Sequence, residues 1–254
     1  MTAPNSARIW NYWQGGEHNY AVDREAGNDY LEVFPAIRDI ALQDRQFLDR
    51  AVHYLSAGAG VDQFLEIGPG LPPAESTHQI LHALDPHARM VLVDHDPLVL
   101  SHARTLLADT PAAPVVVVEA DMLDPEDVLR KAADTLDLTR PVAVLLVGTI
   151  GHAGDFATAE PIVRRLLDGV PSGSYLALNQ PTDTDPGWAR AQDAYNATGA
   201  MPYHLYSPEE IEELFSGLDL VEPGLAECSE WQPHVPAVIP VAEANQLGAV
   251  GRKR

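Results

Sequence analysis

The sequence predicts an α/β fold built around a mainly parallel sheet that helices cover on both faces. Short apolar runs rich in β-branched residues alternate with longer amphipathic segments through the middle of the chain, which is typical of βαβ units. Residues 115–118 and 144–147 are continuously apolar, as expected for strands buried on both faces. Residues 1–60 show helical spacing with a break at Pro35, so we expect a helical cap there and the sheet-containing core in residues 61–254.

The individual elements follow from local patterns. The predicted parallel strands span residues 63–67, 90–94, 115–119, 142–147 and 175–179, with helices between them at 74–84, 98–108, 125–136 and 159–167. A further helix is expected to begin after the N-cap Ser207 and to end near Phe215. Residues 218–221 and 247–250 are predicted to form late antiparallel strands, with a proline-containing loop at 233–240 between them.

Composition excludes several classes of function. The 254 residues include 16 Lys and Arg against 37 Asp and Glu, a net charge of −21, so binding to nucleic acid or to an anionic membrane surface is not expected. With 46% hydrophobic residues the chain can bury a core and is not a disordered acidic protein. The single cysteine, Cys228, excludes an internal disulfide or a cysteine-cluster metal site, and we predict no metal. Short apolar runs and the lack of a secretory leader favour a soluble, cytoplasmic protein.

A glycine turn follows the first predicted strand. Residues 64–73 read Phe-Leu-Glu-Ile-Gly-Pro-Gly-Leu-Pro-Pro, which places Gly68 and Gly70 where open α/β sheets bind ligands. The three prolines have no N–H group to direct at a phosphate, so a pyrophosphate-binding turn is disfavoured. S-adenosylmethionine carries no phosphate and has cationic groups that Glu66 could stabilise. An ordinary βα turn is the alternative.

Two more carboxylates follow the next strands. Asp94 ends the second strand, where nucleoside-binding α/β folds hold a ribose diol. Asp121 follows the third strand and could accept a hydrogen bond from an adenine amino group. For both residues the alternative is a capping role at the start of the following helix.

With these residues at successive strand ends, the chain resembles the class I S-adenosylmethionine-dependent methyltransferases. More narrowly, it resembles the actinobacterial S-adenosyl methyltransferase family that was once described as a domain of unknown function. The resemblance is carried by segments 7–26, 64–73, 93–104, 173–176, 220–225 and 250–253. It implies a Rossmann-like, doubly wound, seven-stranded sheet with an antiparallel last strand, an N-terminal helical cap and S-adenosylmethionine as cofactor.

The resemblance also implies the cofactor-binding residues. From the cap, Tyr20 and Arg24 are expected to close over the methionine carboxylate, with cap packing and a surface ion pair as their alternatives. The complete expected set is Tyr20, Arg24, Glu66, Gly68, Gly70, Asp94, His95, Asp121 and Met122.

The chain departs from the family pattern on the side from which a methyl acceptor would enter. Asn11, Trp13, Glu17, His18 and Tyr206 replace other residues, and so does the segment 149–152. Several of these changes add aromatic or imidazole groups. We therefore expect a specialised member of the family with an aromatic-lined acceptor pocket.

Candidate catalytic and acceptor-binding residues follow from this expectation. His152, after the fourth strand, is the first candidate for positioning the acceptor or removing its proton, and Glu17 and His18 are alternates. A structural histidine and solvated cap charges are the competing interpretations. Stacking on a flat acceptor is expected from aromatic side chains, namely Trp10, Tyr12, Trp13, Tyr203 and Tyr206.

The sequence thus predicts in-line methyl transfer from S-adenosylmethionine to a small, indole-like or phenol-like specialised metabolite. A cofactor-binding protein without transferase activity, such as a cyclase or a regulatory protein, is the alternative, and a nicotinamide-dependent oxidoreductase ranks third. The acceptor atom stays open, and so does whether the chain forms a homodimer.

Overall fold

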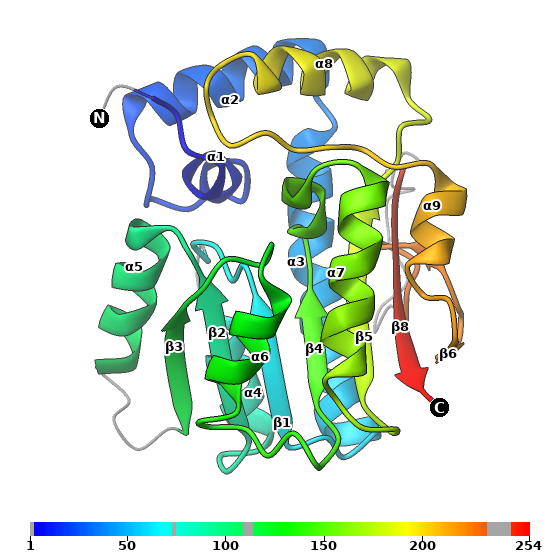
Figure 1. Cartoon of the computed structure of the whole chain (residues 1–254). Coiled ribbons are helices and arrows are strands. Elements are labelled where there is room, and N and C mark those ends of the chain that lie inside the picture. Colours follow the sequence, from blue (N-terminus) through cyan, green and yellow to red (C-terminus); the bar gives the residue numbers. More distant parts are fainter. Residues whose placement is uncertain (1–2, 73–74, 109–113, 233–244) are drawn as a thin grey trace.

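The computed structural model describes residues 3–72, 75–108, 114–232 and 245–254. The described residues form one sheet with the strand order β3-β2-β1-β4-β5-β8-β6, in which β8 alone of these seven runs antiparallel to the others (Figure 1). The two-residue strand β7 pairs with β8 outside this path. This order confirms the predicted doubly wound sheet with an antiparallel last strand. The bounds of the strands are β1 Gln63–Ile67, β2 Arg89–Asp94, β3 Val115–Glu119, β4 Ala143–Leu146, β5 Tyr175–Pro181, β6 Leu218–Leu220, β7 Ala226–Glu227 and β8 Gln246–Lys253.

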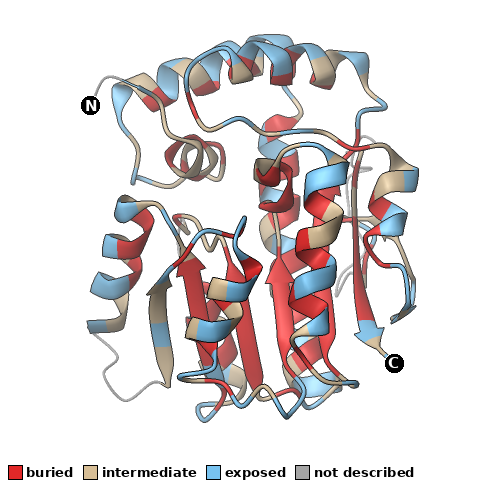
Figure 2. Cartoon of the chain, in the orientation of Figure 1, coloured by how far each residue is buried: buried red, intermediate tan, exposed pale blue. Residues whose placement is uncertain are grey.

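Helices cover both faces of the sheet. Successive strand residues point to opposite faces, so Leu65 and Ile67 pack against helices α6, α7 and α9 on one face. Phe64 packs against α3, α4 and α5 on the other face. Strands β1 and β4 are buried along their whole length (Figure 2), which explains their continuous apolar sequences. The helices are α3 Ile37–His53, α4 Thr77–Leu84, α5 Pro97–Ala108, α6 Pro125–Ala132, α7 Phe156–Asp168 and α9 Pro208–Glu213.

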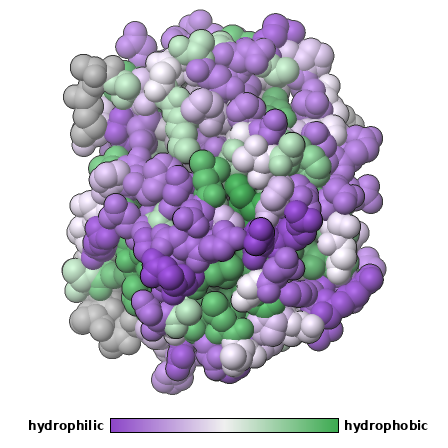
Figure 3. All heavy atoms as spheres, viewed as in Figure 1, coloured by the Kyte–Doolittle hydropathy of each residue, from purple (hydrophilic) through white to green (hydrophobic). Residues whose placement is uncertain are grey.

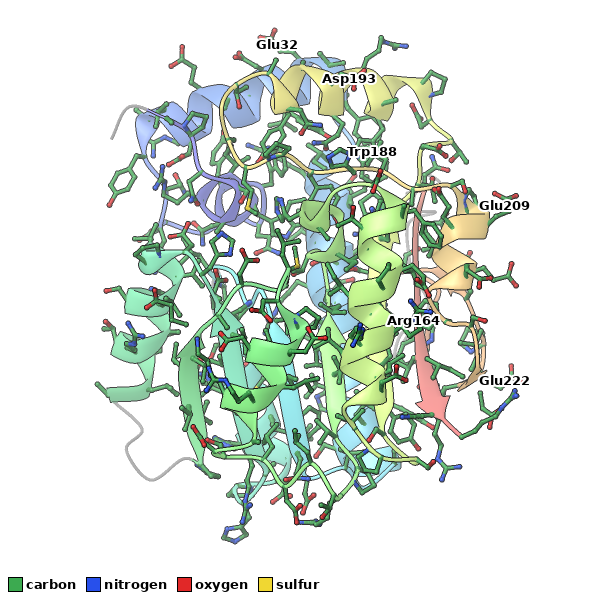
Figure 4. All side chains as sticks on the ribbon, in the orientation of Figure 1. Glu32, Arg164, Trp188, Asp193, Glu209 and Glu222 are labelled. Atoms are coloured by element: carbon green, nitrogen blue, oxygen red, sulfur yellow. The ribbon has the colours of Figure 1, made fainter. Side chains whose placement is uncertain are left out.

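A helical cap lies across the C-terminal ends of the parallel strands (Figure 1). It contains α1 (Ser6–Trp13), α2 (Ala21–Val33), the beginning of α3, and α8 (Pro186–Asn196). Aromatic contacts join these helices: Trp13 and Tyr30 have ring centroids 4.9 Å apart, and Phe34 stacks on Trp188 at 5.1 Å. In Figure 4, Trp188 points from α8 toward the sheet, while Asp193 lies on the outer face. The remainder of α3 packs against the sheet. The first sixty residues therefore contribute both to the hydrophobic cluster of the cap and to the core between α3 and the sheet.

The sequence did not predict α8. Its start signal is present, because Asp185 accepts hydrogen bonds from the backbone N–H groups of Gly187 and Trp188 and Pro186 occupies the first turn. The helix was missed because its apolar residues are few and widely spaced, and because the partner helices that bury them lie more than 150 residues earlier in the chain.

Other predicted boundaries shift by a few residues. Helix α6 ends at Ala132 and not at residue 136, because Asp134 and Thr135 donate to carbonyls three residues back and tighten the chain into a turn. Helix α7 begins three residues earlier than predicted, since Asp155 caps it by accepting from the N–H of Thr158. There are two further short helical turns: η1 (Tyr54–Gly58) precedes β1, and η2 (Ile150–Ala153) follows β4. The predicted helix start at residue 74 and the loop at 233–240 lie outside the described residues.

Hydrophilic residues cover most of the face seen in Figure 3, with hydrophobic residues visible near the middle of the view. Among the described residues, every helix is too short or too polar to cross a lipid bilayer.

A buried ion pair ties the N-terminal segment together. Arg8 Nε lies 2.6 Å from Asp23 Oδ2, and both side chains are almost completely buried. Asp23 also accepts from the backbone N–H groups of Asn5 and Tyr20, at 3.0 and 2.9 Å. The carboxylate thus joins α1 to the start of α2 through three hydrogen bonds.

Replacing Asp23 with Ala should lower the free energy of unfolding by about 3–5 kcal/mol, because it removes the carboxylate that pairs with the buried guanidinium of Arg8. Urea denaturation followed by circular dichroism measures the loss. Asp127→Ala removes a carboxylate from exposed ion pairs with Arg130 and Lys131 and should leave the curve unchanged. Equal denaturation curves for the wild type and Asp23→Ala would show that the Arg8–Asp23 ion pair does not stabilise the fold.

Candidate active site

A cavity of about 380 Å³ lies between the cap and the C-terminal ends of the parallel strands. The glycine turn after β1, the ends of β2 and β4, and helices α1, α3 and α8 supply its walls. Ten of the seventeen residues predicted for the site line this cavity, namely Trp10, Trp13, Glu66, Gly68, Gly70, Asp94, His95, Met122, His152 and Tyr203.

The glycine turn presents backbone to the cavity. Gly68 and Gly70 have φ angles of +72° and +61°, in the left-handed region that favours glycine. A Cβ on Gly68 would lie 2.5 Å from Thr149 Oγ1, whereas a Cβ on Gly70 would meet no atom within 4 Å. Asn11 donates from Nδ2 to the carbonyl of Leu71 at 3.0 Å and so fixes the turn against the cap. The space beside Gly70 is open to a ligand.

Glu66 is a buried carboxylate at the end of β1. Its Oε1 accepts a hydrogen bond from Thr77 Oγ1 at 2.8 Å, while its buried Oε2 has no hydrogen-bond partner among the described residues. Burial raises the pKa of Glu66, and the hydrogen bond from Thr77 lowers it. The effect of burial is the larger, so the pKa is about 7. A buried oxygen without a partner is costly, so Glu66 is suited to receive a donor from a ligand.

The end of β2 supplies the second carboxylate. Asp94 lines the cavity, and its Oδ1 accepts from the backbone N–H of Asp96 at 2.8 Å. Burial raises its pKa, although hydrogen bonds from the backbone oppose the effect. His95 lines the cavity beside it, and the buried side chain of Met122 contributes an apolar wall.

Three predicted cofactor residues lie outside the cavity lining. Tyr20 is exposed, and the guanidinium of Arg8 lies over its ring. Arg24 donates to the backbone and side-chain oxygens of Asn19. Asp121 is exposed and accepts from the N–H of Leu123 at 2.9 Å, in a local turn. The capping role that the sequence left open as its alternative belongs to Asp124, which accepts from the N–H of Asp127. Their roles in cofactor binding stay predictions.

On the acceptor side, His152 has a defined tautomer. Its Nδ1 lies 2.7 Å from the carbonyl oxygen of Pro202, and because a carbonyl only accepts, Nδ1 carries the proton and Nε2 keeps its lone pair. Burial lowers the pKa of His152 to about 4, so the ring is neutral at neutral pH. Tyr203 packs edge-on against it, with ring centroids 4.8 Å apart, and donates from its hydroxyl to Gln180 Oε1.

The other predicted acceptor-side residues lie elsewhere. Glu17 and His18 are exposed, and the ring of His18 packs against His102 at 4.4 Å. The Tyr12 hydroxyl donates to Asn28, at the outside of the cap. Tyr206 is buried in the core, and its hydroxyl donates to the carbonyl of Gly154 at 2.8 Å. The structure therefore brings His152, but neither Glu17 nor His18, to the cavity.

Sequence reasoning missed several ionisable residues of the cavity, among them Asp44 on α3. Its Oδ1 accepts hydrogen bonds from Asn179 Nδ2 and Gln246 Nε2, at 2.6 and 3.1 Å. The sequence does contain a pattern that indicates Asp44: the residue shares the apolar face of α3 with Ala41 and Leu48. A carboxylate on the buried face of a helix indicates a paired or functional group.

A family-wide sequence comparison matches residues 1–254 to a family described as S-adenosyl methyltransferase. The chain belongs to this S-adenosyl methyltransferase family. It is similar to a DUF574 family protein from Streptomyces avermitilis MA-4680, with 40% identity over 99% of this chain and 98% of the other, and a TM-score of 0.93. A candidate methyltransferase from Thermobifida fusca YX is 32% identical over 100% of this chain and 96% of the other, with a TM-score of 0.92.

The fold extends to more distant enzymes. The N-methyltransferase NodS from Bradyrhizobium japonicum WM9, in complex with S-adenosyl-L-homocysteine, has a TM-score of 0.51 at 16% identity and covers 97% of this chain and 98% of its own. Among curated proteins, none matches the chain. The protein is thus an S-adenosylmethionine-dependent methyltransferase, as the sequence predicted, and the alternative of a binding protein without transferase activity is not favoured.

The residues of this S-adenosyl methyltransferase fit its cofactor. Glu66 offers an unpartnered buried oxygen, Gly70 leaves room for a ligand against the backbone, and Asp94 lies at the end of the neighbouring strand. Two carboxylates suit a ligand with cationic groups and hydroxyl donors. These residues, with Met122 as an apolar wall, would hold S-adenosylmethionine.

Gly70→Ala should weaken binding of S-adenosyl-L-homocysteine by at least about tenfold, because the methyl group enters the space that the cofactor needs. Isothermal titration measures the affinity. Gly68→Ala has the same left-handed backbone but clashes with Thr149, so it should mainly destabilise the fold. Unchanged affinity in Gly70→Ala would contradict this placement of the cofactor.

The pKa of Glu66 gives the stability a pH dependence. Between its ordinary pKa of 4.5 and about 7, the folded state retains a proton that the unfolded state has released, so the free energy of unfolding falls as pH rises. Glu66→Gln should remove about 3 kcal/mol of this fall.

Urea denaturation of the ligand-free protein at pH 5 and pH 8 tests this expectation. Glu209→Gln, which changes an exposed carboxylate on α9 (Figure 4), should keep the wild-type difference between the two pH values. If Glu66→Gln also keeps that difference, Glu66 does not carry the raised pKa.

Proposed function

We propose that this methyltransferase acts on a small aromatic acceptor, indole-like or phenol-like, in specialised metabolism. The observation that carries the proposal is the neutral imidazole of His152, which lines the cavity beside aromatic side chains. Tyr203 packs against it, and the remaining aromatic lining comes from the cap, namely Trp10, Trp13, Tyr30, Trp188 and Tyr195. Aromatic walls favour a flat, uncharged ring over a peptide or a nucleic acid.

The chain binds and orients the two reactants. S-adenosylmethionine supplies an electrophilic methyl group, which is transferred to the acceptor by in-line displacement. His152 Nε2 accepts a hydrogen bond from the O–H or N–H of the acceptor and thereby directs the lone pair of that heteroatom. The proton that the acceptor loses on methylation passes along this hydrogen bond, and a pKa of about 4 suffices because an alkylated heteroatom is a stronger acid.

The cap excludes water from the reaction. Helices α1 and α8 close the side of the cavity opposite the strand ends, and their inner faces are lined by Trp10 and Trp188. Holding the two reactants together and limiting their contact with water are the main contributions that an enzyme makes to a displacement at a methyl carbon.

Incubation of the protein with methyl-labelled cofactor and a panel of indoles, phenols, aliphatic alcohols and peptides tests the proposed function. Transfer of label to aromatic compounds is expected. Transfer confined to aliphatic or peptide acceptors would overturn the aromatic assignment.

His152→Ala should lower turnover about a hundredfold and leave the affinity for S-adenosyl-L-homocysteine within about twofold of the wild type. His152→Gln, which keeps a hydrogen-bond acceptor, should restore part of the turnover. His204→Ala removes an exposed imidazole nearby and serves as the control. Full activity of His152→Ala would show that the acceptor is positioned by another group.

A further inference from the structure

Asp44 lies on α3, the helix that connects the cap to the back of the sheet (Figure 1). Its side chain lines the cavity and is otherwise buried, with 5% of its surface exposed. The carboxylate lies beside the turn that follows β4 and leads to His152, because a Cβ on Gly148 would lie 3.3 Å from Asp44 Oδ1. Burial and the charge of Asp44 both raise the pKa of Tyr203, whose ring packs against His152.

The groups that hold Asp44 are neutral. The amides of Asn179 and Gln246 donate to Oδ1, and the indole N–H of Trp10 also favours the charged form. These groups do not offset burial, which raises the pKa of Asp44 to about 6, so the carboxylate is ionised at neutral pH. A buried negative charge held only by neutral donors is stabilised most by a cation.

Against the effect of burial, the charge of the neighbouring Arg45 lowers the pKa of Asp44, but the guanidinium itself is paired with other groups. Arg45 Nε lies 3.1 Å from Asp49 Oδ1, and its terminal nitrogen donates to the carbonyl of Glu75 at 2.8 Å. The carboxylates at the strand ends, Glu66 and Asp94, lie next to the glycine turn and suit the cofactor. Asp44 is therefore a further carboxylate, placed beside the aromatic lining.

We propose that Asp44 binds a protonated amine of the methyl acceptor, so that the acceptor is an aromatic ring that carries a basic nitrogen. This inference rests on the proposed function and makes it more specific. The amine pairs with Asp44 on one side of Tyr203, and the heteroatom that is methylated contacts His152 on the other side. Such two-point binding fixes the orientation of a flat ring that stacking alone leaves free to rotate.

The experiment compares matched pairs of ligands that differ in one charged group. Tyramine is compared with 4-propylphenol, and tryptamine with 3-propylindole, in calorimetric titrations of the protein saturated with S-adenosyl-L-homocysteine. The amine of each pair should bind at least about tenfold more tightly than its neutral partner. Asp44→Asn keeps the shape and an oxygen for the two amide donors, and it should reduce the preference to less than about twofold while cofactor affinity is kept.

Asp39→Asn removes an exposed carboxylate from the same helix and should keep the wild-type preference. Equal binding of amine and neutral partner by the wild type would overturn the role of Asp44 and leave the aromatic acceptor standing. Failure of both members of both pairs to bind would overturn the proposed function and this inference together. A tenfold loss of cofactor affinity in Asp44→Asn would assign the carboxylate to the cofactor. If Asp44→Asn does not fold, the comparison of ligands on the wild type decides the question by itself.

Discussion

The site depends on the hydrogen bonds that hold the helical cap against the ends of the parallel strands. Asn11 reaches from α1 to the carbonyl of Leu71 in the glycine turn, and Asn5 donates to Asp96 Oδ2 at 2.6 Å. Both contacts join the cap to loops that follow strands of the sheet. The cavity is the space left between these anchored layers, so its shape is determined by the cap as much as by the sheet.

Three carboxylates determine the electrostatic character of this cavity. Glu66 and Asp44 are buried and Asp94 is partly buried, and in each case burial is the largest influence on the pKa and disfavours the charged form. Burial of these carboxylates therefore lowers the stability of the ligand-free protein, and a cationic ligand would offset this cost. Much of the overall charge of −21 lies on the surface, and it says less about the chemistry than these three side chains do.

The sequence predicted the sheet well and the cap only in part. Strands β1 and β3 have the predicted bounds, because a parallel strand is recorded in a short local run of apolar residues. Burial on both faces is correct for β1 but wrong for β3, which is the edge strand of the sheet and has Val116 exposed. The same logic predicted the positions of Glu66 and Asp94 at the C-terminal ends of adjacent strands, β1 and β2. Helix α8 and the position of Asp44 depend on contacts between distant segments, which local patterns do not record. Tyr206 was expected to stack on the acceptor but packs in the hydrophobic core, because local sequence does not distinguish these two environments of an aromatic side chain.

The participation of α8 in the cap has a consequence for how the protein folds during synthesis. Tyr30 donates to Gln192, 162 residues later in the chain, and Phe34 stacks on Trp188. The N-terminal helices leave the ribosome long before these partners exist, so their aromatic faces stay exposed until residues 186–196 have been made. Completion of the cap is therefore a late, long-range step, during which the newly made N-terminal segment exposes aromatic surface that the finished protein buries.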